Sequence, residues 1–342
     1  FGSPVHSFAA NKDTSKTSRD SVLAQWERMV NEQFHEPNNV KYDTLVDYDS
    51  NQFDSLITSS LKDSILKYRF DSLNAQTPIE LTYNQTINKY VELYLLKRPE
   101  LTSRILSRTG YYFDIYEEML DKYDIPMELK YLSIIESALH QEARSWAGAS
   151  GLWQFMIGTA RMYDLDIGMY VDERYDMYKA TEAACQHLSD LYVRYDDWLL
   201  ALAAYNAGSG NVNRAIRRAG GEMDFWKIRP FLPRETQAYV PSFIAVNYVF
   251  QYAEQHFINP GLVENPLMES DTIVVNKKIR FEQIAEVLDI EAERLQKMNP
   301  GFRKGIVPAS KERKYNIYLP KDKIDEFINK NDIYNELNKI GK

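Results

Sequence analysis

The sequence predicts a mainly α-helical protein that ends in a small module with two strands. Two observations lead to this fold class. From residue 86 to residue 256, apolar side chains recur at helical spacing and strand signals are missing. After the Asn259-Pro260-Gly261 turn and Pro266, short β-branched runs flank two short helical patterns. We therefore expect an all-helical body followed by a βααβ module.

Helices are expected to begin well before residue 86. Amphipathic patterns predict helices over residues 21–34 and within 50–73, and Pro78 marks a boundary after them. The helices predicted beyond this boundary span residues 86–96, 102–107, 111–123, 126–139, 160–163, 179–195, 197–205, 211–219 and 235–256.

The C-terminal module is predicted from four elements in order. The strands span residues 272–275 and 315–319, and the helices between them span 281–288 and 291–298. An Asn299-Pro300-Gly301 turn follows the second helix.

Composition and charge exclude some classes of function. A net charge of -8 leaves no basic excess to neutralise phosphates, so we expect no nucleic-acid partner. The 24 Tyr and 5 Trp residues either pack a core or offer flat surfaces to sugar rings, and their number does not separate these uses. Cys185 is the only cysteine, so no intrachain disulfide is expected, and we interpret it as a small buried side chain rather than a nucleophile.

No metal site and no cofactor are expected. The five His residues are scattered without Cys or carboxylate partners at ligand spacing. The Gly208-Ser209-Gly210 run lacks the preceding strand and the following lysine of a phosphate-binding loop.

Glu136 is the candidate catalytic residue. The run 126–139 is predicted as a helix with Asp124 as N-cap, and Glu136 falls on its apolar stripe together with Leu132 and Leu139. A desolvated carboxyl has a raised pKa, which would leave Glu136 protonated near neutral pH and able to donate a proton. The alternative is a carboxylate at the edge of the stripe that reaches water, as a lone helical Glu usually does.

The residues after Glu136 favour the catalytic interpretation. Gly148, Ser150 and Gly151 precede the apolar and amide run 152–156, as expected of a turn that lines a pocket. A wholly apolar helix is then predicted over 198–204, and it is followed by the polar side chains Tyr205 and Asn206 and by a glycine turn over 208–210.

These motifs resemble, in order, those of the soluble-type lytic transglycosylases, lysozyme-like enzymes that cut peptidoglycan. The resemblance covers residues 95–255, and the motifs look most like those of the membrane-bound lytic murein transglycosylase D branch. The matching segments are Glu136-Ser137-Ala138, Ser145, 148–156, 171–174, 197–201, 203–208 and 235–241.

The resemblance implies a goose-type lysozyme-like fold and catalysis by one carboxylate. Glu136 would protonate the glycosidic oxygen between N-acetylmuramic acid and N-acetylglucosamine, and would then accept the proton of the C6 hydroxyl as it closes onto C1. The product would be a 1,6-anhydromuramic end. The substrate-binding residues implied by the resemblance are Ser145, Gln154, Met156, Tyr205 and Asn206, with Glu235 and Tyr239 supporting or capping the groove.

The C-terminal module resembles a LysM domain, a small module that binds N-acetylglucosamine chains. The segments 283–285 and 295–301 carry this resemblance. The Gly-Asp-Thr turn usual in that family is replaced by residues 276–280, so a purely structural appendage is the alternative to glycan binding.

The chain is long enough, at 342 residues, for more than one folded unit. We expect a disordered tether over 1–20, an N-terminal helical extension over 21–94, a catalytic domain over 95–258, a LysM-like domain over 271–320 and a helical tail over 321–342.

The expected location is the periplasm or cell envelope. The chain starts at Phe1 and opens with a polar segment, which indicates that a targeting signal has been removed, and a peripheral or lipid-anchored association with the outer membrane is expected through the missing N-terminus. No apolar run approaches the length of a membrane span. We expect a monomer that acts on peptidoglycan glycan strands.

Two other functions stay open. A hydrolytic muramidase of the same fold would use water in place of the C6 hydroxyl, and a non-catalytic scaffold would only bind the wall.

Overall fold

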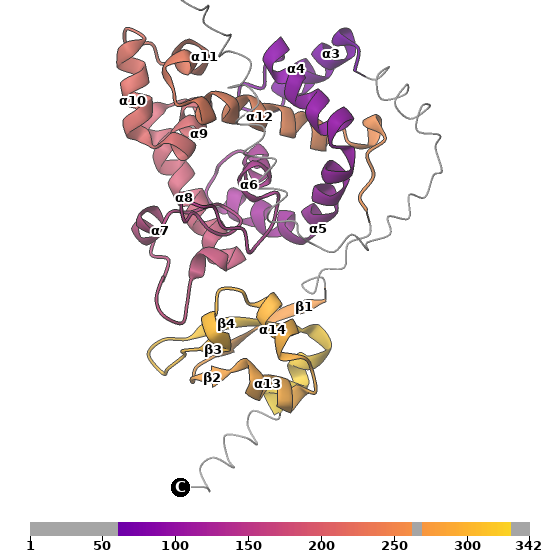
Figure 1. Cartoon of the computed structure of the whole chain (residues 1–342), viewed down its shortest axis with the longest axis vertical. Coiled ribbons are helices and arrows are strands. Elements are labelled where there is room, and N and C mark those ends of the chain that lie inside the picture. Colours follow the sequence, from indigo (N-terminus) through magenta and orange to yellow (C-terminus); the bar gives the residue numbers. More distant parts are fainter. Residues whose placement is uncertain (1–60, 262–268, 330–342) are drawn as a thin grey trace, which may run out of the picture.

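The computed structural model describes residues 61–261 and 269–329, which form a helical body and, below it in Figure 1, a smaller module. The predicted tether, the predicted helix over 21–34 and the first part of 50–73 lie outside the described residues. The predicted fold class, mainly α with a βααβ module, is confirmed.

The body is a set of helices wrapped around the short helix α6. α12 packs against α4, α9 and α6, while α8 packs against α9 and α5. Figure 1 shows α6 inside the ring of longer helices. The helices are α3 (Asp63–Asn74), α4 (Gln85–Glu92), α5 (Pro99–Lys122), α6 (Leu132–Ser137), α7 (Ile157–Met162), α8 (Met177–Tyr195), α9 (Trp198–Ala207), α10 (Ser209–Arg218), α11 (Phe225–Ile228) and α12 (Arg234–Gln251).

Short polar side chains fix where several of these helices begin. Asn84 accepts a hydrogen bond from the amide of Thr86 at 2.9 Å at the start of α4. Asp176 caps α8, and Asp197 caps α9 by accepting from the amide of Leu200 at 2.7 Å. Each cap satisfies an amide that has no partner inside its helix.

Most of the range 126–139 is helical, but the prediction of one continuous helix capped by Asp124 was wrong. The chain forms a 3-10 helix, Met127–Tyr131, and then α6, which ends where Ala138 takes a left-handed conformation with φ 51°. The buried Arg108 donates a hydrogen bond to the carbonyl of Ala138 at 3.3 Å, which helps to hold this turn. Asp124 itself has φ 51°, so it cannot occupy the extended conformation of an N-cap.

The helices predicted over 102–107 and 111–123 are one helix, α5. Gly110 interrupts the sequence pattern, but a glycine inside a helix costs only about 1 kcal/mol relative to alanine. The buried face of α5, which includes Ile105, Tyr112 and Tyr116, outweighs this cost.

α12 contains a proline, Pro241, in its interior. Because proline has no N–H, the carbonyl of Gln237 lacks its usual helical donor. The side chain of Arg229, in the loop before α12, takes that place, with Nε 2.7 Å from the Gln237 oxygen.

The module consists of two small antiparallel sheets and two helices. β1 (Ser270–Val275) pairs with β4 (Tyr315–Pro320), with Thr272 opposite Tyr318. β2 (Ile279–Arg280) pairs with β3 (Ile306–Val307), and these two-residue strands were not predicted because so short a segment carries no pattern. The helices are α13 (Phe281–Leu288) and α14 (Ala292–Met298).

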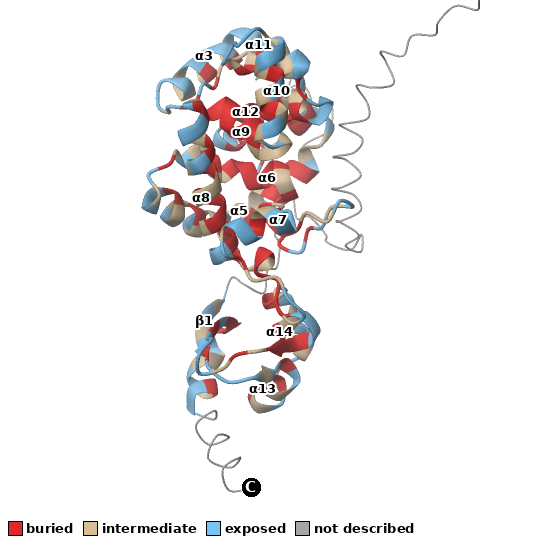
Figure 2. Cartoon of the chain, turned by 90° about the vertical axis from the view of Figure 1, so that its left-hand side faces the viewer, coloured by how far each residue is buried: buried red, intermediate tan, exposed pale blue. Residues whose placement is uncertain are grey.

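The body and the module each have a buried core, shown in red in Figure 2. The two cores meet, because Met298 and Tyr318 of the module pack with the body, and Val171 of the body packs with the module. Within residues 61–261 and 269–329, no helix combines the length and apolar character needed to cross a membrane.

Candidate active site

Glu136 lies near the end of α6, with a half-buried side chain among buried neighbours. The next residue, Ser137, donates from Oγ to the carbonyl of Leu152 at 2.9 Å and so ties α6 to the following turn. The hydroxyl of Tyr239, on α12, donates a short hydrogen bond to Oε1 of Glu136. The proposed acid and a tyrosine 103 residues away thus form a direct pair.

Burial raises the pKa of Glu136 to about 8; the hydrogen bond from Tyr239 lowers it in part, and the charge of Glu235 raises it further. The predicted direction of the pKa shift is therefore confirmed. At pH 7 the carboxyl is mostly protonated, which is the form that can donate a proton to a leaving group.

The turn between Ser145 and Phe155 forms one wall beside α6. Gly148 and Gly151 have φ 90° and 82°, a region that favours glycine. At Gly151 there is a second requirement, because a Cβ there would lie 1.9 Å from the carbonyl oxygen of Arg174. Only glycine allows the two backbone segments to approach so closely.

Ser145 and Gln154 hold this turn in shape. Oγ of Ser145 accepts from the amide of Ala149 at 3.0 Å, and Nε2 of Gln154 donates to the carbonyl of Gly151 at 2.8 Å. Gln154 has φ 48°, which is uncommon for a residue with a side chain. Strained backbone of this kind concentrates at functional sites, where the surrounding structure enforces it.

Tyr205 and Asn206 lie at the end of α9, where Tyr205 contacts the turn and Asn206 contacts α12. The hydroxyl of Tyr205 donates to the carbonyl of Trp153 at 2.8 Å, and Oδ1 of Asn206 accepts from Thr236 Oγ1 at 2.8 Å. Burial, followed by the charge of Glu136, raises the pKa of Tyr205 well above its ordinary value, so its hydroxyl stays protonated.

The two remaining predicted residues are exposed. Glu235 lies at the start of α12 and affects Glu136 through its charge. Met156 is 47% exposed and immediately precedes α7. The structure thus brings Glu136, Tyr239 and Tyr205 into one electrostatic group, which the charge of the exposed Glu235 also affects.

Sequence reasoning underestimated Tyr239 and missed Arg174. Tyr239 was predicted to support or cap the groove, and it donates a hydrogen bond to the acid itself. Arg174 was noted only as part of a matching motif, yet it donates to two carbonyls of the turn, Gly148 at 2.8 Å and Phe155 at 3.0 Å. Because Arg174 directly follows two acidic residues, the sequence indicates a local ion pair. It does not indicate which turn the arginine also binds.

The side chains of Cys185 and His187 are largely enclosed by the protein. Burial raises the pKa of the Cys185 thiol, as expected of a side chain that does not act as a nucleophile. Burial lowers the pKa of His187 to about 4, and its ring packs 5.1 Å from that of Tyr205. In the part of the chain that the structure describes, no three His, Cys, Asp or Glu side chains are grouped to hold a metal ion.

Comparison with protein families identifies both parts of the chain. Residues 115–227 match the model of the transglycosylase SLT domain. The helical body contains a transglycosylase SLT domain. Residues 269–335 match the LysM-like domain of lytic transglycosylase MltD, so the module is a LysM-like domain of that type. Both resemblances inferred from the sequence are confirmed.

Two of the proteins that the chain is similar to are lytic murein transglycosylases. The chain is 31% identical over 232 residues to the membrane-bound lytic murein transglycosylase D of Escherichia coli K12, an alignment that covers 66% of this chain and 50% of that protein. It is 27% identical over 150 residues to the soluble lytic murein transglycosylase of the same strain, covering 41% of this chain and 23% of that one. The crystal structure of the 70 kDa soluble lytic transglycosylase of E. coli aligns with a TM-score of 0.39 and 18% identity, over 70% of this chain and 44% of that one. The chain therefore spans half the length of the first of these relatives.

Proposed function

We propose that this protein is a peptidoglycan lytic transglycosylase in which Glu136 is the catalytic carboxyl. The observation that carries the proposal is the buried setting of Glu136, which raises its pKa to about 8 and keeps it protonated at neutral pH. The SLT domain and the lytic murein transglycosylases among its relatives support the substrate class.

The reaction needs one group that first donates and then accepts a proton. Glu136 gives its proton to the glycosidic oxygen as the bond from C1 of N-acetylmuramic acid to that oxygen breaks. The 2-acetamido group of the same sugar assists at C1. The ionised Glu136 then takes the proton of the C6 hydroxyl while O6 bonds to C1, which restores the acid. The products are a new 4-hydroxyl end and a 1,6-anhydro end, and no water is consumed.

Single-carboxylate chemistry fits the surroundings of Glu136. Most glycosidases place a second carboxylate across the scissile bond as base or nucleophile. Among the described residues, the carboxylate that affects Glu136 is Glu235, which is exposed and makes no hydrogen bond to it. The group that contacts Glu136 is instead the Tyr239 hydroxyl, which stays protonated and can stabilise the carboxylate after it has given up its proton.

The sugar subsites in this proposal lie along the turn and the end of α9. Ser145 and Gln154 shape the turn, Tyr205 contacts it from α9, and the adjacent Asn206 bonds to Thr236 of α12. The exposed Met156 contributes an apolar contact at the rim. We also propose that the LysM-like domain contacts glycan strands, that the protein works as a monomer in the periplasm or cell envelope, and that it is anchored at the outer membrane.

Product analysis of digested peptidoglycan tests the function. We expect mass spectrometry to find 1,6-anhydromuramic ends with the wild-type chain, whereas reducing ends would establish a hydrolytic muramidase. Glu136→Gln should lower the rate by at least about a hundredfold because it removes the proton cycle. A folded Glu136→Gln variant with substantial turnover would move the catalytic role elsewhere, and a wild-type chain that clears no wall material would leave only the binding scaffold.

A further inference from the structure

The SLT domain and the LysM-like domain are joined through their backbones. The amide of Asp172 donates to the carbonyl of Gly301 at 2.8 Å, and the amide of Arg303 donates to the carbonyl of Tyr170 at 2.8 Å. Between these two bonds, Val171 and Phe302 form an antiparallel bridge. Paired backbones of this kind fix the register of the two segments, as in a sheet.

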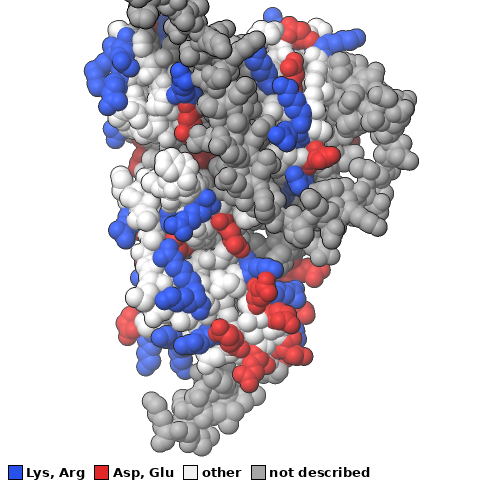
Figure 3. All heavy atoms as spheres, in the orientation of Figure 1, with Lys and Arg blue, Asp and Glu red and all other residues white. Residues whose placement is uncertain are grey.

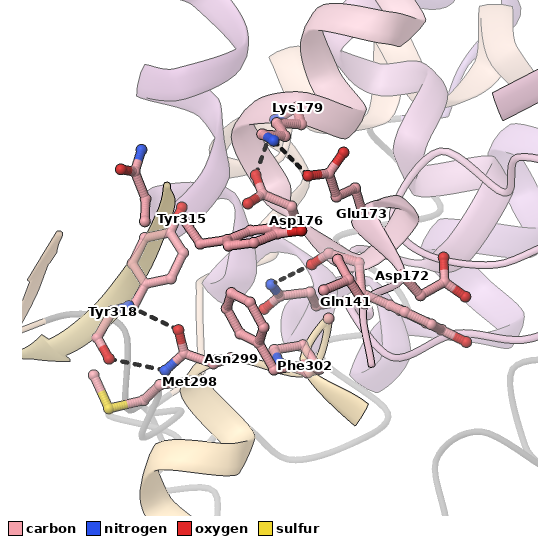
Figure 4. Close-up of a pocket in the computed structure, with 15 residues that line it drawn as sticks. Gln141, Asp172, Glu173, Asp176, Lys179, Met298, Asn299, Phe302, Tyr315 and Tyr318 are labelled. Carbon is pink, nitrogen blue, oxygen red and sulfur yellow. Dashed lines mark hydrogen bonds and ion pairs between the residues drawn. The ribbon is translucent and has the colours of Figure 1, made fainter. Parts of the chain in front are cut away.

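Next to this joint, residues of both domains line one pocket (Figure 4). Gln141 of the SLT domain donates to the carbonyl of Tyr175 at 2.8 Å, and Asn299 of the LysM-like domain bonds to the backbone of Tyr318 at 2.7 and 2.8 Å. Gln141 and Asn299 are thus each held by the backbone of their own domain, which gives this side of the joint a defined shape.

At the centre of the joint, Asp172 is fully buried between two arginines. Its carboxylate accepts from Arg174 at 2.9 Å (Nε) and 2.8 Å (Nη2), and from Nη2 of Arg303 at 2.5 Å. Burial opposes its ionisation, but the hydrogen bonds and charges of Arg174 and Arg303 prevail and lower the pKa of Asp172. The second nitrogen of Arg303, Nη1, donates to the carbonyl of Gly168 at 2.8 Å.

Arg174 connects this buried group to the active-site turn. Its Nη1 donates to the carbonyl of Gly148 within the turn and to that of Phe155 at its end. Its own carbonyl oxygen packs against Gly151, where no Cβ would fit. The position of the turn, including Gln154, therefore depends on the position of Arg174.

We infer that the LysM-like domain positions the active-site turn of the SLT domain, and that Arg303 is the positioning residue that acts through Asp172 and Arg174. Without Arg303, the buried Asp172 keeps only the counter-charge of Arg174, and the joint at 168–172 loses two hydrogen bonds. A buried charge that loses a partner is strongly disfavoured, so the segment must shift or admit water. Arg174 would move with it. The catalytic consequence of this inference rests on the function proposed above.

The test compares Arg303→Gln with the wild-type full-length chain in two measurements. Hydrogen–deuterium exchange of the segment 148–155 should be faster in the variant, although position 303 is far away in the sequence. The kcat on soluble glycan fragments should fall by about tenfold, less than the hundredfold that a displacement of 1 Å can cause. Soluble fragments are used so that adhesion of the LysM-like domain to whole sacculi does not affect the rate.

Two further variants serve as controls. Lys314→Gln removes one exposed positive charge from the same domain, whose Lys and Arg side chains gather on one side in Figure 3, and it should leave exchange and rate unchanged. Arg303→Lys keeps the charge but not the forked geometry of arginine, and should restore part of the rate. If Arg303→Gln does not fold, Arg303→Lys carries the comparison.

The outcomes separate this inference from the proposed function. Unchanged exchange at 148–155 in a folded Arg303→Gln variant, or equal acceleration throughout α8, α9 and α12, would overturn the positioning role, even if the wild-type chain makes anhydro products. Faster exchange confined to 148–155 and 166–176 would support it, even if the wild-type chain makes none.

Discussion

Replacing Tyr239 by Phe should move the pH dependence of the reaction upward. The tyrosine hydroxyl donates to Glu136, and this hydrogen bond lowers the carboxyl pKa, which burial raises to about 8. A hydrogen bond to a charged group contributes about 1.5–3 kcal/mol, and one pKa unit corresponds to about 1.4 kcal/mol. Loss of the hydroxyl should therefore raise the pKa of Glu136 by roughly one to two units.

The assay is kcat/KM for the release of anhydro products between pH 5 and pH 10. The wild-type rate should fall as the pH rises through the pKa of Glu136 near 8, because only the protonated carboxyl can donate. The falling limb of Tyr239→Phe should lie at higher pH, and its plateau should be lower because the carboxylate formed in the reaction loses a donor.

Tyr248→Phe is the matched control. Tyr248 is also a buried tyrosine of α12, but it lies further along the helix than Tyr239, and its hydroxyl bonds to His256 at 2.7 Å. This change should leave the falling limb in place. A limb that stays near pH 8 in Tyr239→Phe, or moves to lower pH, would refute the account of how Glu136 is tuned.

Three other changes have defined outcomes. Glu136→Gln should stabilise the protein at pH 8 and above by up to about 5 kcal/mol, and should give no gain below pH 4.5. The reason is that the raised pKa makes the ionised carboxyl costly in the folded state, and thermal unfolding measured against pH tests it. Gly151→Ala should lower the free energy of unfolding by about 3 kcal/mol or more, since its Cβ would meet the Arg174 carbonyl and φ is 82°. Gly110→Ala, which lies in open space on α5, should raise the free energy of unfolding by about 0.5–1 kcal/mol, and denaturant unfolding compares the two. Tyr205→Phe should cost about 1 kcal/mol of stability for its lost hydrogen bond and a larger share of the rate, and an unchanged rate in a destabilised protein would assign it to packing.

Local signals in the sequence were sufficient for much of the fold. Asp197 stands directly before an apolar run, and it caps α9. The range predicted for the first helix of the module coincides with α13. These elements depend on a few neighbouring residues, so their patterns could be interpreted without the rest of the chain.

The errors occurred where distant segments decide the conformation. The end of α6 and its left-handed Ala138 depend in part on a hydrogen bond from Arg108, and the continuity of α5 depends on packing of its buried face. The contact between Tyr239 and Glu136 could not be predicted for the same reason, since no residue near Glu136 in the sequence indicates which helix will face it.

The joint between the domains could not be predicted either. A carboxylate shared by Arg174 and Arg303 appears in the sequence only as scattered charges, the second of them 131 residues from Asp172. The Pro and Gly residues around position 260 indicate a boundary between two folded units, but they carry no information about the surfaces on either side.

The proline in α12 has a consequence for exchanging parts between related proteins. Because Pro241 leaves the Gln237 carbonyl to Arg229, the first turns of α12, which carry Tyr239, are fastened to the preceding loop as well as to their own helix. The loop that carries Arg229 and the helix α12 must therefore be exchanged together. A chimaera that takes the loop from one homologue and the helix from another must bring the arginine and the proline together, since either alone leaves a donor or an acceptor unmatched.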